Sequence, residues 1–546
     1  GKKVRFVFRN TSDYWRVLQM LLKSESLRNG TEQTVQSGLL WRIFKDDTEK
    51  PYFFNLIDSE RKSLLQGDVP YFSAYTDTTA LELERETISS FFIEPSFDLV
   101  VKRLKKLDNS DMELQVSYIK NALYSRVAKD SHILSEPLPG LSFDHVKIFS
   151  EKSFLEKAIE IGEEIRKLAV IDRDKHITWI APQYIEKIER YQLSPLGYEL
   201  YGGTSGVALF MAALASVTGL EWCRTMALGA INLLRRELQE KNTDTSIPDN
   251  IGGTTGIGSL IYAFVSISRF LDEKELLLDA VKLAGLITKE LVDRDTKYDV
   301  IAGSAGAILG LLSLHRILPD SPALSKALLC GKHLVENRKS WPSVEGNRMT
   351  GFSHGLAGIA LSLLNLYSFT GEEAFLEGAV KAIEEENSLF DSENNNWPHF
   401  VKFPSMVKKG FWVTWCHGGP GIGLARLGGL SVYDTDQIRK DIDIALNITG
   451  KFLLSHIDHI CCGNFGRNEL LVAASKKFSD AHLLSKARSH ASWIIEHRKE
   501  KGYFNLDMKF AGGAFNPGLF KGTSGIGYQL LRLIYPDRIP SLLLWE

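Results

Sequence analysis

Apolar segments with almost no polar face alternate with amphipathic segments along the chain downstream of residue 180. The apolar segments include 206–217, 306–318 and 358–369, and their composition predicts helices that are buried on all sides. Each is followed by a segment with one polar face, such as 222–241, which predicts an outer helix that covers the apolar one. The pattern therefore predicts a succession of helical hairpins.

A Gly-x-x-Gly segment opens each apolar helix, and seven such segments recur at spacings between 45 and 63 residues. They lie at residues 203–206, 253–256, 303–306, 355–358, 418–421, 463–466 and 522–525. Near-regular spacing indicates structural repeats, which form an open solenoid or a closed ring. A solenoid carries polar capping repeats at its ends, whereas the first and last repeats here share the sequence GTSG. We therefore predict a mainly α fold, an α/α toroid of seven inner and seven outer helices with all glycine turns at one end.

The region upstream has a mixed pattern and is expected to form a smaller α+β domain. The expected elements are a strand at 2–9, a helix at 11–27 with Thr or Ser at its N-cap, a strand and turn at 67–75, and a helix at 111–128. A linker rich in proline, glycine and serine follows at 135–142. We predict a domain boundary there, with the first domain at 1–140 and the toroid at 141–546.

Composition and charge exclude several classes of function. A net charge of −2 gives no electrostatic basis for nucleic acid as a partner, and we interpret the basic cluster at 101–106 as a solvated helix face. Five cysteines do not make a disulfide framework, so their use fits a reducing cytosol, with Cys223 and Cys330 as packed thiols. The sequence shows neither a signal peptide nor an apolar run long enough to span a bilayer. Because the chain begins with glycine, we expect it to be processed, excised or part of a longer protein.

Candidate chemistry is concentrated just before three of the glycine turns. The first three turns carry bland residues, whereas the next three carry His354, the pair Cys416–His417 and the pair Cys461–Cys462. Since consecutive repeats are neighbours in space, these residues should converge at one mouth of the ring. Three thiolates suit a tetrahedral zinc ion with one open position, so we predict Cys416, Cys461 and Cys462 as ligands, with His417 or His354 as the alternative to one of them. The competing interpretation is that these cysteines are small buried thiols.

A zinc ion with three thiolate ligands is a poor Lewis acid for water but holds an external thiol as a nucleophilic thiolate. Addition of that thiolate to an activated alkene makes an enolate, and His354 is the natural acid to protonate it. His417 would orient a ligand or share the proton work, and Asp299 would orient or deprotonate a neighbouring group. Asp299 is equally well explained as a surface carboxylate, and Lys521 and Arg467 have weaker claims to the same mouth.

The segments WCHGGPGIGLARL, CCGNFGRNELL and GFSHGLAGIALSLL, with the seven glycine turns, resemble the lanthionine synthetase C-like cyclases. The resemblance covers about residues 180–546. It implies that Cys416, Cys461 and Cys462 are zinc ligands, as in the subgroup with three cysteine ligands, and that His354 and Asp299 are the catalytic histidine and aspartate. Many relatives carry an acidic residue in the first turn, whereas this chain has LYGGTSG there, so no role is carried over onto that turn.

The upstream segments VRFVFRNTSDYW and QGDVPYFSA resemble the end of the dehydratase module of class II lanthipeptide synthetases. That family phosphorylates Ser and Thr of a precursor peptide and then eliminates phosphate, and Arg5 and Thr11 match its elimination residues in type and spacing. The kinase-like residues that bind ATP and Mg²⁺ are not in this chain, so we do not expect this polypeptide alone to dehydrate a peptide. The implied partners are a precursor peptide with leader and core, the N-terminal dehydratase portion on the same or another chain, and membrane-associated export machinery.

These observations lead to one preferred function, lanthionine formation in the cytoplasm of a bacterium. A peptide cysteine thiolate held by Zn²⁺ would add to dehydroalanine or dehydrobutyrine, and His354 would protonate the product. One alternative is addition of a small thiol such as glutathione to a dehydrated residue. Another is a non-catalytic scaffold in which structural zinc supports peptide binding. A toroid that acts on sugars is disfavoured, because it needs paired carboxylates at the mouth.

Overall fold

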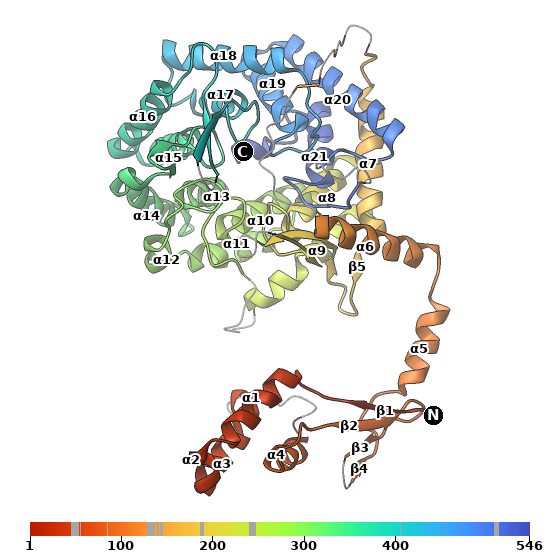
Figure 1. The fold of residues 1–546 in the computed structure, drawn as a ribbon. Helices are drawn as coiled ribbons and strands as arrows, with labels where there is room; N and C mark the ends of the chain where they lie inside the picture. The colour runs from red at the N-terminus through yellow and green to blue at the C-terminus, as the bar shows by residue number, and fades with distance from the viewer. Residues whose placement is uncertain are drawn as a thin grey trace. The chain divides into compact units, whose positions relative to one another are not determined.

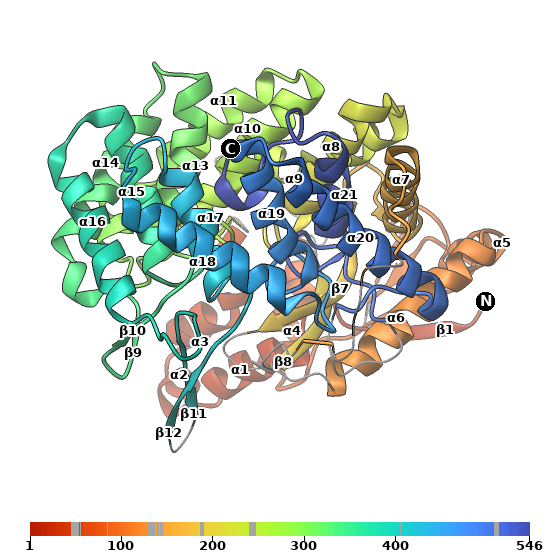
Figure 2. The same ribbon diagram turned by 90° about the horizontal axis from the view of Figure 1, so that it is seen from above.

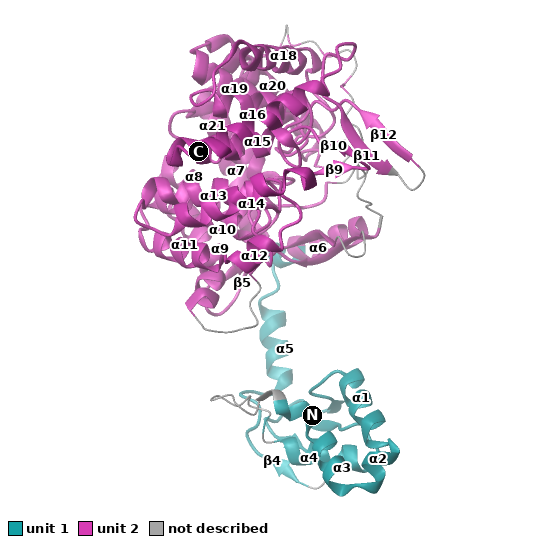
Figure 3. Ribbon diagram, turned by 90° about the vertical axis from the view of Figure 1, so that its left-hand side faces the viewer, with its two compact units in different colours: residues 1–112 teal, residues 113–546 magenta. Residues whose placement is uncertain are grey.

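The computed structural model describes residues 1–44, 54, 56–83, 86–127, 137–138, 141, 143, 146–185, 190–239, 247–403, 406–506 and 513–546. The chain forms two compact units, Gly1–Met112 and Glu113–Glu546 (Figure 3). The helix that spans this division, α6 (Asn109–Val127), is tied to the second unit by Asn121, whose side chain exchanges two hydrogen bonds with the backbone of Phe515. Most of the linker at 135–142 lies outside the described residues, so the predicted domain boundary at 140/141 stays a prediction.

The first unit combines a small antiparallel sheet with short helices, as the sequence predicts. The sheet has the order β1 (Lys3–Phe6), β2 (Phe72–Tyr75), β3 (Leu81–Glu82) and β4 (Thr87–Ile88). The helices are α1 (Thr11–Leu21), α2 (Ser24–Arg28), α3 (Gly30–Ser37), α4 (Ile57–Leu65) and α5 (Ser96–Lys105). The expected N-cap is wrong by one position: Asn10 is the N-cap of α1, and its side chain makes no capping hydrogen bond.

The second unit is a ring of paired helices, which confirms the predicted α/α toroid (Figure 1). Seven inner helices are found among the described residues: α8 (Thr204–Thr218), α10 (Ile257–Leu271), α13 (Ser304–Ile317), α15 (Leu356–Thr370), α17 (Gly419–Gly429), α19 (Asn464–Phe478) and α21 (Thr523–Ile534). Their outer partners are, in order, α9 (Glu221–Gln239), α11 (Glu275–Leu286), α14 (Ala323–Glu336), α16 (Glu373–Ser388), α18 (Asp436–Phe452), α20 (Ala481–Lys501) and α7 (Glu151–Lys167). A short helix, α12 (Lys289–Asp293), lies beside α14. None of the described helices has both the length and the apolar character needed to cross a membrane.

The ring is closed by elements from the two ends of the second unit. The last inner helix, α21, packs against the first outer helix, α7, and also against the first inner helix, α8. At the glycine turns, the backbone N–H of Phe520 donates to the carbonyl oxygen of Tyr201 at 2.9 Å. The N–H of Tyr201 in turn donates to Thr254 of the next turn at 2.9 Å. The first and last repeats are therefore neighbours, as the shared GTSG sequence predicts.

The glycines allow the first turn of each inner helix to pack closely against the loop backbone that precedes it. The backbone N-caps of the inner helices are Gly203, Gly256, Gly303, Gly355, Gly418, Gly463 and Gly522. A Cβ atom on Gly466 would lie 2.0 Å from the carbonyl oxygen of Ile460, so only glycine fits there. The second turn differs from the predicted register, because α10 begins three residues later than the Gly-x-x-Gly phase of the other repeats requires.

Two further features were not predicted. Antiparallel hairpins interrupt the helical repeats: β5 (Val170–Ile171) with β6 (Ile177–Thr178), β7 (Ile180–Ile185) with β8 (Arg190–Pro195), β9 (Ser343–Val344) with β10 (Asn347–Arg348), and β11 (His399–Phe403) with β12 (Met406–Gly410). The β11–β12 hairpin extends away from the ring of helices (Figure 2). The chain ends inside the ring (Figure 1), where a 3₁₀ turn at Leu542–Leu544 and Trp545 are buried.

Candidate metal centre and active site

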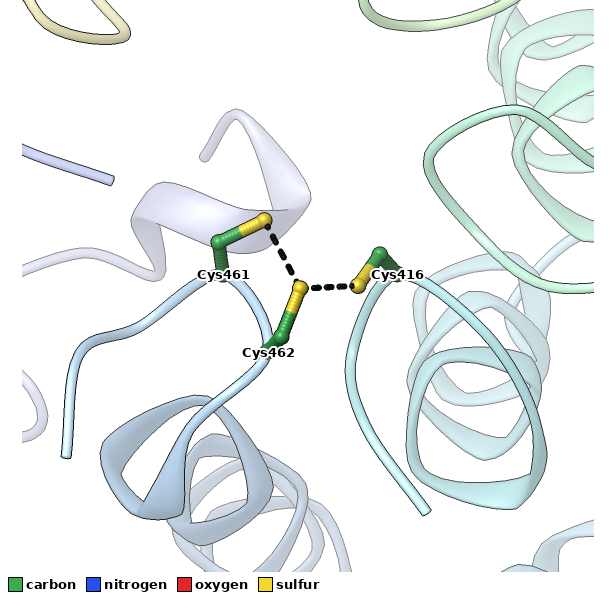
Figure 4. Close-up of side chains that lie close together, drawn as sticks. All are labelled: Cys416, Cys461 and Cys462. Atoms are coloured by element: carbon green, nitrogen blue, oxygen red, sulfur yellow. Dashed lines mark hydrogen bonds between the residues drawn. The ribbon is translucent and has the colours of Figure 1, made fainter. Parts of the chain in front are cut away.

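Three cysteines from two glycine turns meet at one point (Figure 4). The Sγ atoms of Cys416 and Cys462 lie 2.8 Å apart, and those of Cys462 and Cys461 lie 3.4 Å apart. All three sulfurs lie within 4.8 Å of one another, although the turns are separated by more than 40 residues in the sequence. The sequence-based prediction that the cysteine pair meets a remote cysteine is therefore confirmed in its geometry.

Hydrogen bonds between neighbouring turns hold the cysteine backbones in place. The carbonyl oxygen of Cys416 accepts the N–H of Ser353 at 3.3 Å and its hydroxyl at 3.2 Å. The N–H of Cys461 donates to the carbonyl oxygen of Phe520 at 3.0 Å. The N–H of Cys462 donates to Nδ1 of His459 at 3.3 Å. The sulfurs are thus positioned by the fourth, sixth and seventh turns together.

The three thiols are chemically unequal. Burial raises the pKa of the Cys416 thiol, whereas hydrogen bonds from the thiols of Cys416 and Cys462 lower the pKa of Cys461. The positive charges of His459 and Lys521 act on Cys461 in the same direction. Of Cys416 and Cys461, the thiol of Cys461 is therefore the one whose thiolate form its neighbours favour. Three cysteine sulfurs in reach of one point form a donor set that suits zinc. The bonds from zinc to cysteine sulfur are about 2.3 Å long.

The predicted histidine and aspartate form a pair beside the cysteines. Nδ1 of His354 lies 2.6 Å from Oδ2 of Asp299. The other carboxylate oxygen of Asp299 accepts the N–H groups of Ala302 at 2.8 Å and Gly303 at 3.2 Å, which fixes the carboxylate at the third turn. Burial opposes protonation of His354, but the hydrogen bond and charge of Asp299 outweigh it, so the pKa of His354 is raised. Asp299 is buried, which contradicts its interpretation as a surface carboxylate.

His417, the other predicted histidine, occupies a different environment from His354. Its ring lies 6.1 Å from that of His354 and 3.7 Å from that of His399, measured between centroids. Burial lowers the pKa of His417 well below the usual range, and the neighbouring His399 and His354 add to the effect. A neutral His417 suits orientation and hydrogen bonding better than proton donation at neutral pH.

The comparisons with known proteins agree with this geometry. The family model described as lanthionine synthetase C-like protein matches residues 194–544, which is more than half of the chain. The chain belongs to the lanthionine synthetase C-like family. A second family model, described as a domain of unknown function (DUF4135), matches residues 1–75 of this lanthionine synthetase C-like chain, within the first compact unit.

Two known proteins resemble this family member over most of its length. The lacticin 481/lactococcin biosynthesis protein LcnDR2 of Lactococcus lactis subsp. lactis is 23% identical over 565 aligned positions, covering 97% of this chain and 55% of that protein. The chain therefore spans about half the length of the curated relative it matches. The structure of a nisin cyclase covers 72% of this chain and 97% of its own, with 18% identity and a TM-score of 0.50. That likeness concerns the fold, and it fits the ring of helices.

Tyr201 is a residue at the site that the sequence did not predict, because the first turn carries no residue typical of metal or acid–base chemistry. The hydroxyl of Tyr201 donates to Sγ of Cys461 at 3.3 Å. The Tyr201 ring stacks on Phe520 with centroids 5.0 Å apart and planes 6° apart. The only available signal was position: Tyr201 stands two residues before the first Gly-x-x-Gly, where Cys461 stands in the sixth repeat. Ring closure was needed to see that these two positions face each other.

The residues with weaker claims divide into two groups. Arg467 is buried and donates to the carbonyl oxygen of Val413 and the hydroxyl of Ser455, so it supports the fold of the two cysteine turns rather than the mouth. Lys521 is half-buried and acts on Cys461 through its charge. In the first unit, Arg5 lies on β1 with its guanidinium 4.7 Å from the ring centroid of Tyr71, and Thr11 is the exposed first residue of α1.

Proposed function

We propose that this chain forms lanthionine and methyllanthionine thioether rings in a ribosomally made peptide, with zinc as its metal. The observation that carries the proposal is the meeting of Cys416, Cys461 and Cys462 beside the His354–Asp299 pair. The family membership supports the same reaction class, and the donor set supports the choice of metal. The three cysteines would hold the ion.

Bound zinc would supply a site at which a substrate cysteine thiol loses its proton at neutral pH and stays nucleophilic. Asp299 keeps His354 oriented through Nδ1 and favours its protonated form, so His354 can deliver a proton to the α-carbon after sulfur has added to the β-carbon of dehydroalanine or dehydrobutyrine. His417 packs beside His354 and restricts the space around it. The reaction balances internally, because one S–H bond and the π bond of the C=C are replaced by one C–S and one C–H bond, and the C–C single bond remains.

The first unit supports a wider role that this chain would fill only in part. We propose that it is the end of a Ser/Thr dehydratase, with Arg5 and Thr11 taking part in phosphate elimination. The match of residues 1–75 to a family model of its own and the alignment with the longer lacticin 481/lactococcin biosynthesis protein support this assignment. ATP and Mg²⁺ would act in the remaining dehydratase portion. The partners would then be that portion, the precursor peptide and membrane-associated export machinery, and the setting would be the cytoplasm.

The proposal is tested by supplying a peptide that is already dehydrated and contains free cysteines. The wild-type chain should bind about one zinc per molecule by elemental analysis and consume peptide thiols without a change in peptide mass. Cys416→Ala should lose both properties. Cys330→Ala, which removes a buried thiol of the outer helix α14, is the matched control and should keep both. Undiminished ring formation by Cys416→Ala would refute the role of the metal.

The same assay separates the alternatives. Glutathione is added in competition with the peptide cysteines, and the products are weighed. A product heavier by one glutathione per dehydrated residue would show that the chain adds small thiols instead of forming rings. Metal-dependent peptide binding with no loss of free thiols would make the chain a scaffold.

A further inference from the structure

A second hollow lies at the end of the ring opposite the glycine turns. It has a volume of about 460 Å³ and is lined by the C-terminal halves of α10 and α13, the middle of α15, the end of α17, and the last residues of the chain. The cysteines lie at the N-terminal ends of the inner helices, so this cavity is separate from the candidate metal centre. The proposed function assigns it no role.

Two arginines line this cavity without a carboxylate partner. Arg269 stands in the last turn of α10, and Arg316 stands in the last turn of α13. Among the ion pairs of the described residues, neither guanidinium lies within 4.0 Å of a carboxylate oxygen. Arg316 donates to the carbonyl oxygen of Trp545 at 3.3 Å. Burial lowers the pKa of Arg316; Tyr262 and the charge of Glu546 oppose this effect, and the positive charge of Arg269 adds to it.

A buried serine hydroxyl lines the same cavity. Ser266 lies one turn before Arg269 on α10, and its side chain is 3% exposed. Its Oγ lies beside the buried hydroxyl of Tyr262, one turn earlier on α10, and among the described residues these two hydroxyls have no further hydrogen-bond partner. Two buried hydroxyls with only each other leave hydrogen-bonding capacity unused, which a ligand in the cavity could take up.

The arginines have a simpler explanation, which accounts for only part of the site. Positive side chains at helix C-termini interact favourably with the last carbonyl groups. That interaction requires neither two arginines on one cavity nor a buried serine hydroxyl beside them. The Glu546 side chain also lines the cavity and offsets some of the charge, but one of its oxygens is taken by the N–H of Ser541 at 2.8 Å.

We infer that this cavity binds a phosphate group, either free or as the monoester of a small molecule. Arginine forks pair with phosphate oxygens in two-point contacts, and the serine hydroxyl adds a donor for a further oxygen. The apolar walls formed by residues such as Val265, Leu361 and Leu544 leave room for a small organic group beside the phosphate. Free phosphate and a phosphate monoester would bind the arginines in the same way. Only the monoester would also fill this additional volume.

The test is thermal unfolding of the full chain in increasing inorganic phosphate, with ionic strength held constant by chloride. Phosphate should raise the unfolding temperature of the wild type, of Cys416→Ala and of the control Arg294→Gln, whose arginine is exposed at the end of α12. The double variant Arg269→Gln/Arg316→Gln should lose this shift, and Ser266→Ala should show a smaller one. An equal shift in the double variant, or none in the wild type, overturns the inference.

A second measurement protects the result against variants that fold poorly. Broadening of the ³¹P resonance of phosphate by the protein reports binding directly, and circular dichroism identifies variants that retain the helical fold. If the double variant is folded and still broadens the ³¹P resonance as strongly as the wild type, the inference is overturned. O-phosphoserine is the monoester probe: a larger temperature shift than that from phosphate at equal concentration assigns the site to monoesters, and an equal shift assigns it to free phosphate.

Discussion

At the scale of single residues, the cysteine cluster is surrounded by donors that the protein holds rigidly. Tyr201 is fixed by three backbone hydrogen bonds, one from its N–H to the second turn and two from the seventh turn to its carbonyl oxygen, and by its stack on Phe520. Its hydroxyl points at Cys461. A hydrogen bond to a thiolate withdraws electron density from sulfur and tunes how strongly that sulfur binds a metal.

Tyr201→Phe removes this hydrogen bond without changing the ring. We expect metal content to be retained, the sulfur-to-cobalt charge-transfer band of the Co²⁺-substituted protein to shift, and cyclisation to slow by about tenfold, as for loss of a ~1.5 kcal/mol hydrogen bond to a charged group. Tyr367→Phe, which removes a hydroxyl bonded to Glu373 on the helix surface, is the control. An unchanged spectrum would mean that Tyr201 only fills space.

Asp299→Asn separates charge from orientation at His354. The amide oxygen can still accept the N–H groups of Ala302 and Gly303, so the turn should keep its shape. Asp299 raises the pKa of His354, and its neutralisation should lower that pKa. In the proposed mechanism the protonated form is the acid, so the alkaline limb of the cyclisation rate against pH should move to lower pH. The exposed Asp293→Asn should leave the profile in place.

His490 predicts how stability depends on pH. Burial, with smaller contributions from Lys486 and Arg467, lowers its pKa to about 3, against about 6.5 in the unfolded chain. Below about pH 6.5 the His490 side chain is protonated in the unfolded chain but stays neutral in the folded chain. The free energy of unfolding therefore falls as the pH falls. Between pH 6.5 and 5 this amounts to about 1.6 kcal/mol. Urea unfolding at both pH values should show a smaller loss for His490→Asn; equal losses would contradict the assignment.

At the scale of elements, the sequence was sufficient for the inner helices and their turns but not for the hairpins. The inner helices are apolar on all faces, and glycine is required where a helix starts against a carbonyl group, so both leave a strong pattern. The β11–β12 hairpin has no comparable pattern, because its residues are mostly half-exposed and alternate weakly. It nevertheless contributes His399, which packs on His417, and so part of the site escaped prediction.

Gly466→Ala tests whether the turn geometry positions the cysteines. The new Cβ would meet the carbonyl oxygen of Ile460 at 2.0 Å, directly before the cysteine pair. Displacement of that backbone should lower the free energy of unfolding by about 1–3 kcal/mol and weaken metal binding. Gly285→Ala, on the outer helix α11, meets nothing within 4 Å and should be neutral or stabilising by about 0.5–1 kcal/mol. Competition with a zinc chelator and urea titration measure the two effects.

At the scale of the whole second unit, the ring encloses an unpredicted central segment. The 3₁₀ turn Leu542–Leu544 and Trp545 enter the core, and Trp545 stacks on Phe352 with centroids 6.1 Å apart. A buried network anchors the segment: Arg532 binds Glu469 at 2.7 Å and the carbonyl oxygen of Ile539 at 2.6 Å, and Ser541 donates to Glu469 at 2.6 Å. A repeat pattern cannot show this, because the segment belongs to no repeat.

Trp545→Ala should destabilise the ring by about 3–5 kcal/mol, the usual cost of removing a buried indole. Because Phe352 stands two residues before His354, the same change should also reduce cyclisation beyond the loss of folded protein. Trp15→Ala, at an indole that is 59% exposed in the first unit, is the control and should change stability little. Urea unfolding monitored by circular dichroism measures the difference; similar midpoints for both variants would contradict it.

The pairing of α7 with α21 has a consequence for how the toroid is made. During translation α7 is made before the other helices of the ring. Its apolar stripe then stays uncovered until α21, the last inner helix, has been synthesised. The cysteine turns can gather beforehand, but Phe520, which braces Cys461 and Tyr201 alike, arrives only with the final helix. A nascent or truncated chain that stops short of this point is an open arc, and catalytic competence should appear only when synthesis of the barrel is complete.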